Sequence, residues 1–302
     1  MANEPDETVS QIEVNALAAK AHASTYCLID RTNGADGTVV AINIGARFFL
    51  ATAAHVIPAS HEFSVVLRDS IDNVYDFAAR HVHPTLDVGL LELLPKDVPR
   101  FRDTFVPADR IGAEADQDTE YNVTVVGYPE KFIDQIDRRP LTQNETLQVH
   151  QCNAFTFLSV ALPRSEWPTS GTRTDPVLGV DIFISFHPDD SLQFMNAKTT
   201  GTVPVTIGSP APHPSGISGG GIWLFRPSAP NAVWQPVALL HAIQFGFSRS
   251  GWLRGALIDT WLEVVENNYS DLKNEIQKIR QRSVSEKATQ QERGNEADGL
   301  RP

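Results

Sequence analysis

Cysteine, long apolar runs and net positive charge are scarce in this chain of 302 residues. Its N-terminus, MANEPDETVSQ, has neither the basic region nor the apolar core of a secretory signal. We therefore predict a cytoplasmic protein whose two cysteines, Cys27 and Cys152, are reduced and packed rather than paired. No stretch approaches the ~20 apolar residues that a membrane-spanning helix needs.

The charge balance excludes two classes of partner. The formal net charge is -12 at pH 7. An acidic protein gains nothing from counterion release on nucleic acid or from attraction to an anionic membrane, so we expect it to bind neither. A protein or peptide substrate is not excluded by this charge.

Short β-rich runs with turn signals between them fill most of the chain. Examples are the runs TVVAINIGARFFL, VGLLELL and GGIWLFR, and long helical patterns are few. This texture indicates an all-β barrel or sandwich. We place about six strands in residues 21–112 and about six in residues 118–256, with a proline-containing seam between the two sets.

The two ends of the chain differ from this β-rich middle. Residues 1–20 are polar and predict an N-terminal arm, either mobile or packed as a leader helix. Apolar residues recur at steps of three and four from Ile258 to Ile279, which predicts a helix over 257–280. That helix either docks on the second set of strands or extends as a partner-binding coil. Residues 281–302 have few large apolar residues and predict a disordered tail.

Three short segments carry residues of one chemistry. ATAAHV includes His55, HPTLDVGLLEL includes Asp87, and PSGISGGGIW includes Ser218. A serine hydroxyl becomes nucleophilic when an imidazole takes its proton, and the imidazole needs a carboxylate to fix its tautomer. The order His, Asp, Ser is one of the known chain orders for such a catalytic triad. We therefore predict that His55, Asp87 and Ser218 act together.

The glycines around Ser218 predict an oxyanion hole. Charge that develops on a substrate oxygen needs donors held in place beforehand, and the N–H groups of Gly216 and Ser218 converge only in an unusual turn. Glycine at 216 permits that backbone, while Gly219 and Gly220 let the chain pass close beneath the nucleophile.

These segments resemble those of the trypsin-like serine peptidase superfamily in its bacterial form. The resemblance rests on TAAH ending at His55, DVGLL beginning at Asp87 and GISGG around Ser218, and it covers about residues 22–265. Gly37-Thr38 and Gly127-Tyr128-Pro129 are supporting matches. The resemblance implies two six-stranded antiparallel β-barrels, the chymotrypsin-like fold. It also implies serine endopeptidase activity without a cofactor, on a protein or peptide substrate.

The sequence departs from the superfamily pattern in three places. Ile217 stands where digestive members have the aspartate that pairs with a newly cut N-terminus, so that activation route is not expected. Pro212 stands where a preference for Lys or Arg requires an acid. A long loop from Ser185 to Ser215 is expected to gate the approach to Ser218, and a regulatory protein partner is a further possibility.

The substrate pocket is the least determined part of the site. We expect Pro212, His213 and His241 to line it. The run LLHAIQFG resembles a segment of glutamyl endopeptidases and of viral cysteine proteases in which a histidine favours Glu or Gln, the role that His241 would take. The alternative is that His241 is a strand residue that faces elsewhere.

Three other interpretations compete with this one. An α/β-hydrolase needs an acid and then a histidine after the serine, and the chain lacks that order. His81 and His83 have a spacing that suits a metal, but no third ligand is evident, so no metal is expected. A catalytically silent or partner-activated binding module on the same scaffold stays open as the alternative function.

Overall fold

The computed structural model describes fourteen stretches of the chain. They are residues 19–30, 36–57, 63–67, 70–74, 77–101, 104–112, 117–130, 147–148, 153–186, 194–198, 201–204, 213–226, 237–248 and 251–282. The predicted tail from residue 283 onward, most of the predicted N-terminal arm, Cys152 and Pro212 lie outside them.

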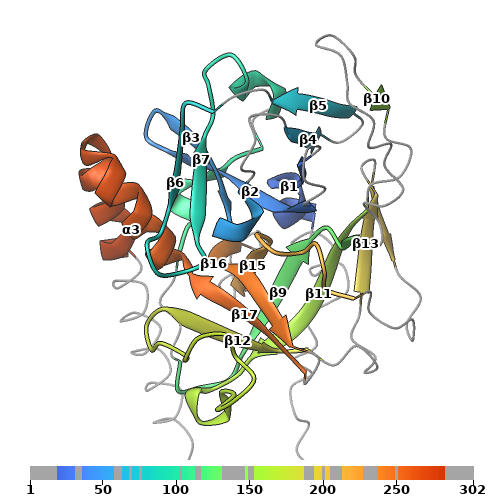
Figure 1. Ribbon diagram of the computed structural model, residues 1–302, viewed down its shortest axis with the longest axis vertical. Coiled ribbons are helices and arrows are strands. Elements are labelled where there is room, and N and C mark those ends of the chain that lie inside the picture. Colours follow the sequence, from blue (N-terminus) through green and yellow to red (C-terminus); the bar gives the residue numbers. More distant parts are fainter. Residues whose placement is uncertain are drawn as a thin grey trace, which may run out of the picture.

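Two β-sheets make up most of the structure (Figure 1). The first has nine strands, of which eight follow the order β10-β5-β4-β1-β2-β3-β7-β6, while β8 pairs with β2. Its strands are β1 (Thr25–Asp30), β2 (Asp36–Ile44), β3 (Arg47–Thr52), β4 (Phe63–Leu67), β5 (Ser70–Val74), β6 (Ala79–Val82), β7 (Gly89–Glu92), β8 (Val106–Pro107) and β10 (Leu147–Gln148).

The second sheet has eight strands in the order β12-β17-β16-β15-β9-β11-β13-β14. They are β9 (Tyr121–Gly127), β11 (Asn153–Ala161), β12 (Asp181–Ser185), β13 (Phe194–Lys198), β14 (Gly201–Pro204), β15 (Gly221–Arg226), β16 (Val237–Ser248) and β17 (Trp252–Leu257). An additional pairing of Ala161 with Ile184 joins β11 to β12. That pairing closes β12, β17, β16, β15, β9 and β11 into a six-stranded antiparallel barrel.

The prediction of an all-β fold with two barrels is confirmed in part. The second sheet forms the expected six-stranded barrel. In the first sheet, the strand pairings among the described residues form an open path from β10 to β6, and none of them closes it. The stretch 185–215, predicted as one long loop, holds the hairpin of β13 and β14.

The interior of each sheet follows from the alternation of apolar residues along its strands. In the first sheet, Val39, Leu50 and Leu91 belong to one buried cluster. In the second, Val125 and Ile222 belong to another. Burial of this apolar surface stabilises each sheet by about 25 cal/mol per Å² removed from water.

A third apolar cluster joins the two sheets. It combines Ile42 and Phe49 of the first sheet with Trp223 and Leu240 of the second, and with Trp261 of the C-terminal helix. A parallel bridge between Ile111 and Leu240 runs beside it. The two sheets therefore share one continuous core.

The predicted C-terminal helix is present, but as two segments. Helix α3 (Ile258–Asn268) ends at Tyr269, whose φ of -133° is not helical, and the turn η5 (Ser270–Leu272) leads into further helical residues up to 282. The helical residues therefore extend past 280, where we had predicted the tail to begin. No described helix is long and apolar enough to span a membrane.

The C-terminal segments pack on both sheets rather than on the second alone. Helix α3 contacts β7 of the first sheet and β16 of the second (Figure 1). Arg47 lies 2.6 Å from Glu92 and 3.1 Å from Asp271, and the Tyr269 hydroxyl donates to Glu92. Arg282 donates to the carbonyl of Ile111, which lies between the sheets.

The last described part of the N-terminal arm is packed and helical. Residues 19–23 form a helical turn, and Ala21 is fully buried in the core shared by the sheets. The His22 ring is hydrogen-bonded to the Thr156 hydroxyl of β11. Cys27, in β1, is buried, and its thiol donates to the carbonyl of Leu28 at 3.9 Å.

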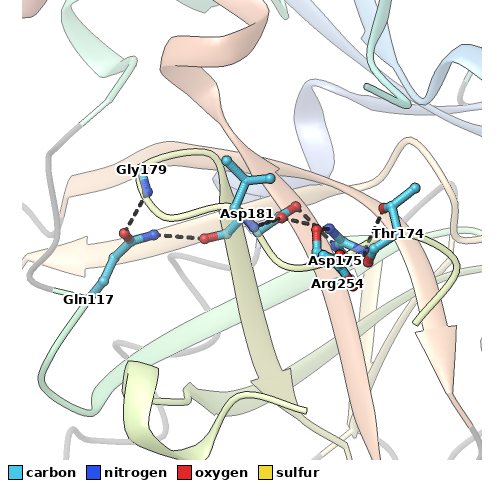
Figure 2. Close-up of polar contacts among 7 residues, drawn as sticks. Gln117, Thr174, Asp175, Gly179, Asp181 and Arg254 are labelled. Atoms are coloured by element: carbon cyan, nitrogen blue, oxygen red, sulfur yellow. Dashed lines mark hydrogen bonds and ion pairs between the residues drawn. The ribbon is translucent and has the colours of Figure 1, made fainter. Parts of the chain in front are cut away.

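A buried ion pair joins strands β12 and β17 of the second sheet (Figure 2). Arg254 of β17 binds both carboxylate oxygens of Asp181 in β12, at 3.0 and 2.6 Å. The same guanidinium donates to the carbonyls of Thr174 and Asp175, while Gln117 donates to the carbonyl of Asp181. Arg254 thus helps to hold the loop before β12 to the barrel, together with Gln117, which accepts the N–H of Gly179 at 2.9 Å.

Candidate active site

His55 and Asp87 meet because two paired strands end beside each other. Strand β3 ends at Thr52, three residues before His55, and β7 begins at Gly89, two residues after Asp87. Thr52 and Gly89 are direct partners in the ladder between these strands. The pairing places the imidazole and the carboxylate at the same edge of the first sheet.

Two hydrogen bonds join this pair. The Nδ1 atom of His55 lies 2.6 Å from Oδ2 of Asp87, and the backbone N–H of His55 donates to Oδ1 at 2.9 Å. Both carboxylate oxygens are used, so neither side chain turns freely. The His55 side chain is still 48% exposed, so part of the ring is open to solvent.

The turn before Asp87 is shaped by a histidine that we had weighed as a metal ligand. Nδ1 of His83 accepts the backbone N–H groups of Thr85 and Leu86, at 3.3 and 3.1 Å. His81, two residues earlier in β6, packs edge-on against the Tyr269 ring. Both contacts are structural, and His83 helps to set the direction in which the chain enters Asp87.

The pKa of Asp87 is below its ordinary value. Burial alone raises the pKa of this carboxyl, but hydrogen bonds from the ring and backbone of His55 outweigh that effect. The group is therefore an anion at neutral pH. An anionic partner fixes the proton of His55 on Nδ1 and favours the imidazolium that forms when Nε2 takes a proton.

Ser218 lies in a tight turn that only glycines permit. Gly216 and Gly219 have φ of +88° and +90°, in the left-handed region. A Cβ on Gly216 would lie 2.5 Å from the backbone nitrogen of Glu130 and 2.8 Å from the carbonyl oxygen of Tyr128. One on Gly219 would overlap the carbonyl oxygen of Thr38. The turn is thus packed between the end of β9 and the start of β2.

Backbone hydrogen bonds tie the turn to strand β16. The N–H of Gly219 donates to the carbonyl of Gln244 at 2.7 Å, and the N–H of Gln244 donates to the carbonyl of Gly220 at 2.8 Å. Thr38 of the first sheet donates its N–H to the carbonyl of Ser218, also at 2.8 Å. Ser218 therefore lies where the two sheets meet, on the side where β3 delivers His55.

The predicted oxyanion donors are free. Among the described residues, the N–H groups of Gly216 and Ser218 donate to no acceptor. Each belongs to a peptide group whose carbonyl is held from the opposite side, because Glu130 donates to Ser215 at 2.7 Å and Gly220 donates to Ile217 at 2.8 Å. In a trans peptide the carbonyl and the N–H point in opposite directions. Anchoring the two carbonyls therefore fixes where the two donors point.

The third contact of the predicted triad is not made. In the described part of the chain, no hydrogen bond joins the Ser218 hydroxyl to His55. Catalytic hydrogen bonds are often long before substrate binds, so this gap does not remove the pair as candidates. The structure thus joins His55 to Asp87, and brings Ser218 to the same junction without a direct bond.

Of the predicted pocket residues, the structure describes His213 and His241, while Pro212 lies outside the described residues. His213 is exposed, packs edge-on against Phe247 at a centroid distance of 5.0 Å, and accepts the N–H of Ser215. His241 is buried and lies 3.1 Å from the hydroxyl of Tyr121, at the start of β9. The residue of β16 that pairs with the serine turn is Gln244, three positions further on.

Sequence reasoning missed three residues that hold the turn. Thr38 and Gln244 bind it from the two sheets, and Glu130 accepts the Ser215 hydroxyl at 2.5 Å. A signal in the sequence lies near two of them only: the supporting match at 37–38 includes Thr38, and the one at 127–129 ends next to Glu130. Gln244 had none, because we had placed the pocket at His241.

No family model and no curated protein matches the chain. Solved structures that are similar to it include a serine protease of a human pathogenic astrovirus, 12% identical, which covers 78% of this chain and 90% of its own with a TM-score of 0.36. An inactivated protease paralogue of the scabies mite is 13% identical over 83% and 96%, with a TM-score of 0.46. Rv3671c of Mycobacterium tuberculosis H37Rv, in an inactive form, is 14% identical over 88% and 96%, with a TM-score of 0.41. At such values the likenesses carry no argument of their own.

Proposed function

We propose that the chain is a serine endopeptidase of the trypsin-like kind, with His55, Asp87 and Ser218 as its catalytic triad. The observation that carries the proposal is the turn at 215–220. It presents two unpaired N–H donors beside a serine and is bonded to the sheet that carries a hydrogen-bonded His55–Asp87 pair. Nucleophile, base and oxyanion donors are the groups that acyl transfer needs.

In the proposed reaction each of these groups has one role. His55 takes the hydroxyl proton of Ser218 on Nε2 as Oγ attacks the carbonyl carbon of the scissile bond. The N–H groups of Gly216 and Ser218 stabilise the oxyanion of the tetrahedral intermediate. His55 then gives its proton to the leaving amine as the C–N bond breaks. Water attacks the acyl-enzyme in the same way, which releases the acid and returns the proton to Ser218.

Active-site labelling tests the proposal. A fluorophosphonate probe should label the wild type and neither Ser218→Ala nor His55→Ala, because phosphonylation requires an activated serine. The wild type should also cleave an unfolded protein substrate, with neither variant doing so. Labelling of Ser218→Ala at the wild-type rate would show that another residue reacts and would contradict the assignment.

A second function is favoured by one observation, the missing hydrogen bond between Ser218 and His55. A binding module that is silent, or that becomes active when a regulatory protein binds, would keep the scaffold with the serine unactivated. Titration of the probe separates the two functions. Under the peptidase proposal the isolated chain reacts, whereas under the alternative it does not react alone at any probe concentration or pH between 6 and 9.

A further inference from the structure

Thr38 is the residue of the first sheet on which the serine turn rests. It lies in β2, is fully buried, and uses all three of its polar groups in four hydrogen bonds. Its N–H donates to Ser218 at 2.8 Å, and its carbonyl accepts the Thr52 hydroxyl at 2.8 Å. Its own hydroxyl lies 3.1 Å from the carbonyl of Gly216 and 2.9 Å from the N–H of Tyr128.

The direction of the two hydroxyl bonds is fixed by their partners. The N–H of Tyr128 is a donor, so the Thr38 oxygen accepts from it. The Gly216 carbonyl is an acceptor, so the Thr38 hydroxyl must give its single proton to it. The hydroxyl therefore links the end of β9 to the turn, and neither of the two bonds competes with the other.

These bonds act on both residues that supply the oxyanion donors. Thr38 holds the carbonyl of Ser218 through its backbone and the carbonyl of Gly216 through its side chain. The bond from Thr38 to the Gly216 carbonyl restricts ψ of Gly216. The bond from Glu130 to the Ser215 carbonyl holds the preceding peptide group. With both sides held, Gly216 keeps its φ of +88° and its N–H stays turned toward the site.

Strand β2 also connects the turn to the base. The Thr52 hydroxyl that binds the Thr38 carbonyl stands three residues before His55, at the end of β3. One residue thus contacts the turn that carries the nucleophile and the strand that delivers the base. A shift at Thr38 would change the distance between Ser218 and His55 as well as the position of the donors.

We infer that the Thr38 hydroxyl is a positioning group for the oxyanion turn, and that it acts through Gly216 without touching the substrate. The inference rests on the proposed function. It goes beyond packing, because a residue that merely filled the junction would be replaceable by valine, which has nearly the same shape and lacks only the hydroxyl.

Three variants test it. Thr38→Val removes the hydroxyl and keeps the shape, whereas Thr38→Ser keeps the hydroxyl. Thr25→Val is the matched control, because the buried hydroxyl of Thr25 bonds the Ala21 carbonyl at 2.7 Å and does not contact the turn. For each full-length variant we would measure kcat and KM on one peptide, the fluorophosphonate labelling rate, and amide hydrogen exchange in the peptide that spans 213–221.

For Thr38→Val we expect kcat and the labelling rate to fall about 10- to 100-fold with KM nearly unchanged, since misplaced donors weaken transition-state binding alone. Exchange in 213–221 should become faster. Thr38→Ser should restore both readouts, and Thr25→Val should leave both at wild-type values while lowering the melting temperature. Unchanged exchange and unchanged kcat in Thr38→Val would overturn the inference.

The two readouts separate this inference from the proposed function. If the wild type does not react with the probe yet Thr38→Val speeds exchange of the turn, the peptidase proposal falls and the positioning role of Thr38 stands. If the wild type reacts and Thr38→Val matches it in rate and exchange, the positioning role falls and the proposed function stands.

Discussion

At the scale of single residues, two separate constraints require glycine at the positions around Ser218. One is conformation, since Gly216 and Gly219 have positive φ. The other is space, because the backbone of Thr38, Tyr128 and Glu130 occupies the positions that a Cβ would take. Gly171 shares the first reason alone: its φ is +79°, but nothing lies within 4 Å of a Cβ there.

This contrast gives a prediction for alanine substitutions. Gly171→Ala should cost about 1–2 kcal/mol of unfolding free energy, the strain of a left-handed alanine. Gly219→Ala should cost more and should abolish fluorophosphonate labelling, because the turn must move away from Thr38. Urea denaturation and probe labelling measure the two effects. A Gly219→Ala protein that labels at the wild-type rate would contradict the close packing of the turn.

The three residues of the proposed triad were identifiable from the sequence, but most of what holds them was not. His55, Asp87 and Ser218 stand in short motifs whose residues are neighbours in the chain. The bond between Thr38 and Gly216 joins residues 178 positions apart, and that between Ser215 and Glu130 spans 85. No local pattern encodes such contacts, because they depend on how two sheets meet.

At the scale of elements, apolar alternation predicted most of the strands that frame the site. It failed in the stretch 185–215, where prolines, glycines and aspartates suggested a loop and two strands form a hairpin. Apolar periodicity also predicted one C-terminal helix, whereas the structure has two helical segments. The apolar spacing continues through Tyr269, so periodicity alone does not reveal the break that lets its hydroxyl reach Glu92.

The ion pair in Figure 2 makes a prediction for the second barrel. Arg254 and Asp181 are almost fully buried, and Arg254→Leu leaves the carboxylate without its partner. We expect a loss of about 3–5 kcal/mol in unfolding free energy, the usual cost of breaking a buried pair. Replacing both residues with leucine should recover part of that loss.

The control is an exposed pair of the same kind. Lys278 and Glu275 lie 2.8 Å apart on the C-terminal helical surface, so Lys278→Ala should cost about 0–1 kcal/mol. Urea denaturation of the three variants measures the difference. Equal losses for Arg254→Leu and Lys278→Ala would mean that the buried pair does not anchor the loop before β12.

At the scale of the whole molecule, acid should weaken the attachment of the N-terminal segment. Burial lowers the pKa of His22 from 6.5 to about 4, so the folded chain resists its protonation. Between these two values the unfolded chain binds the proton more readily than the folded one. Stability is therefore full above pH 6.5 and falls as the pH is lowered toward 4.

Between pH 6.5 and pH 4 we expect the free energy of unfolding to fall by about 1–3 kcal/mol. The lower end is favoured because His22 keeps some exposure to solvent. Urea denaturation at pH 7 and pH 4.5 measures it, and His22→Gln should flatten the dependence. His81→Gln is the comparison, since burial lowers the pKa of His81 in the same direction. Asp87 acts at lower pH than His22, because hydrogen bonds from His55 hold its pKa below the ordinary value of an aspartate. An unchanged slope in His22→Gln would place the acid sensitivity elsewhere.

The C-terminal residues that join the sheets are also synthesised after the strands of the two sheets. Trp261 and Ile276 complete the shared core, and Arg282 binds the carbonyl of Ile111 between the sheets. At about 5–20 residues per second, the ribosome makes Ser218 several seconds before Arg282. During that interval the nascent chain has every residue of the proposed triad but lacks the segments that fix one sheet against the other. We therefore expect the site to reach its final geometry only after translation has passed the helices.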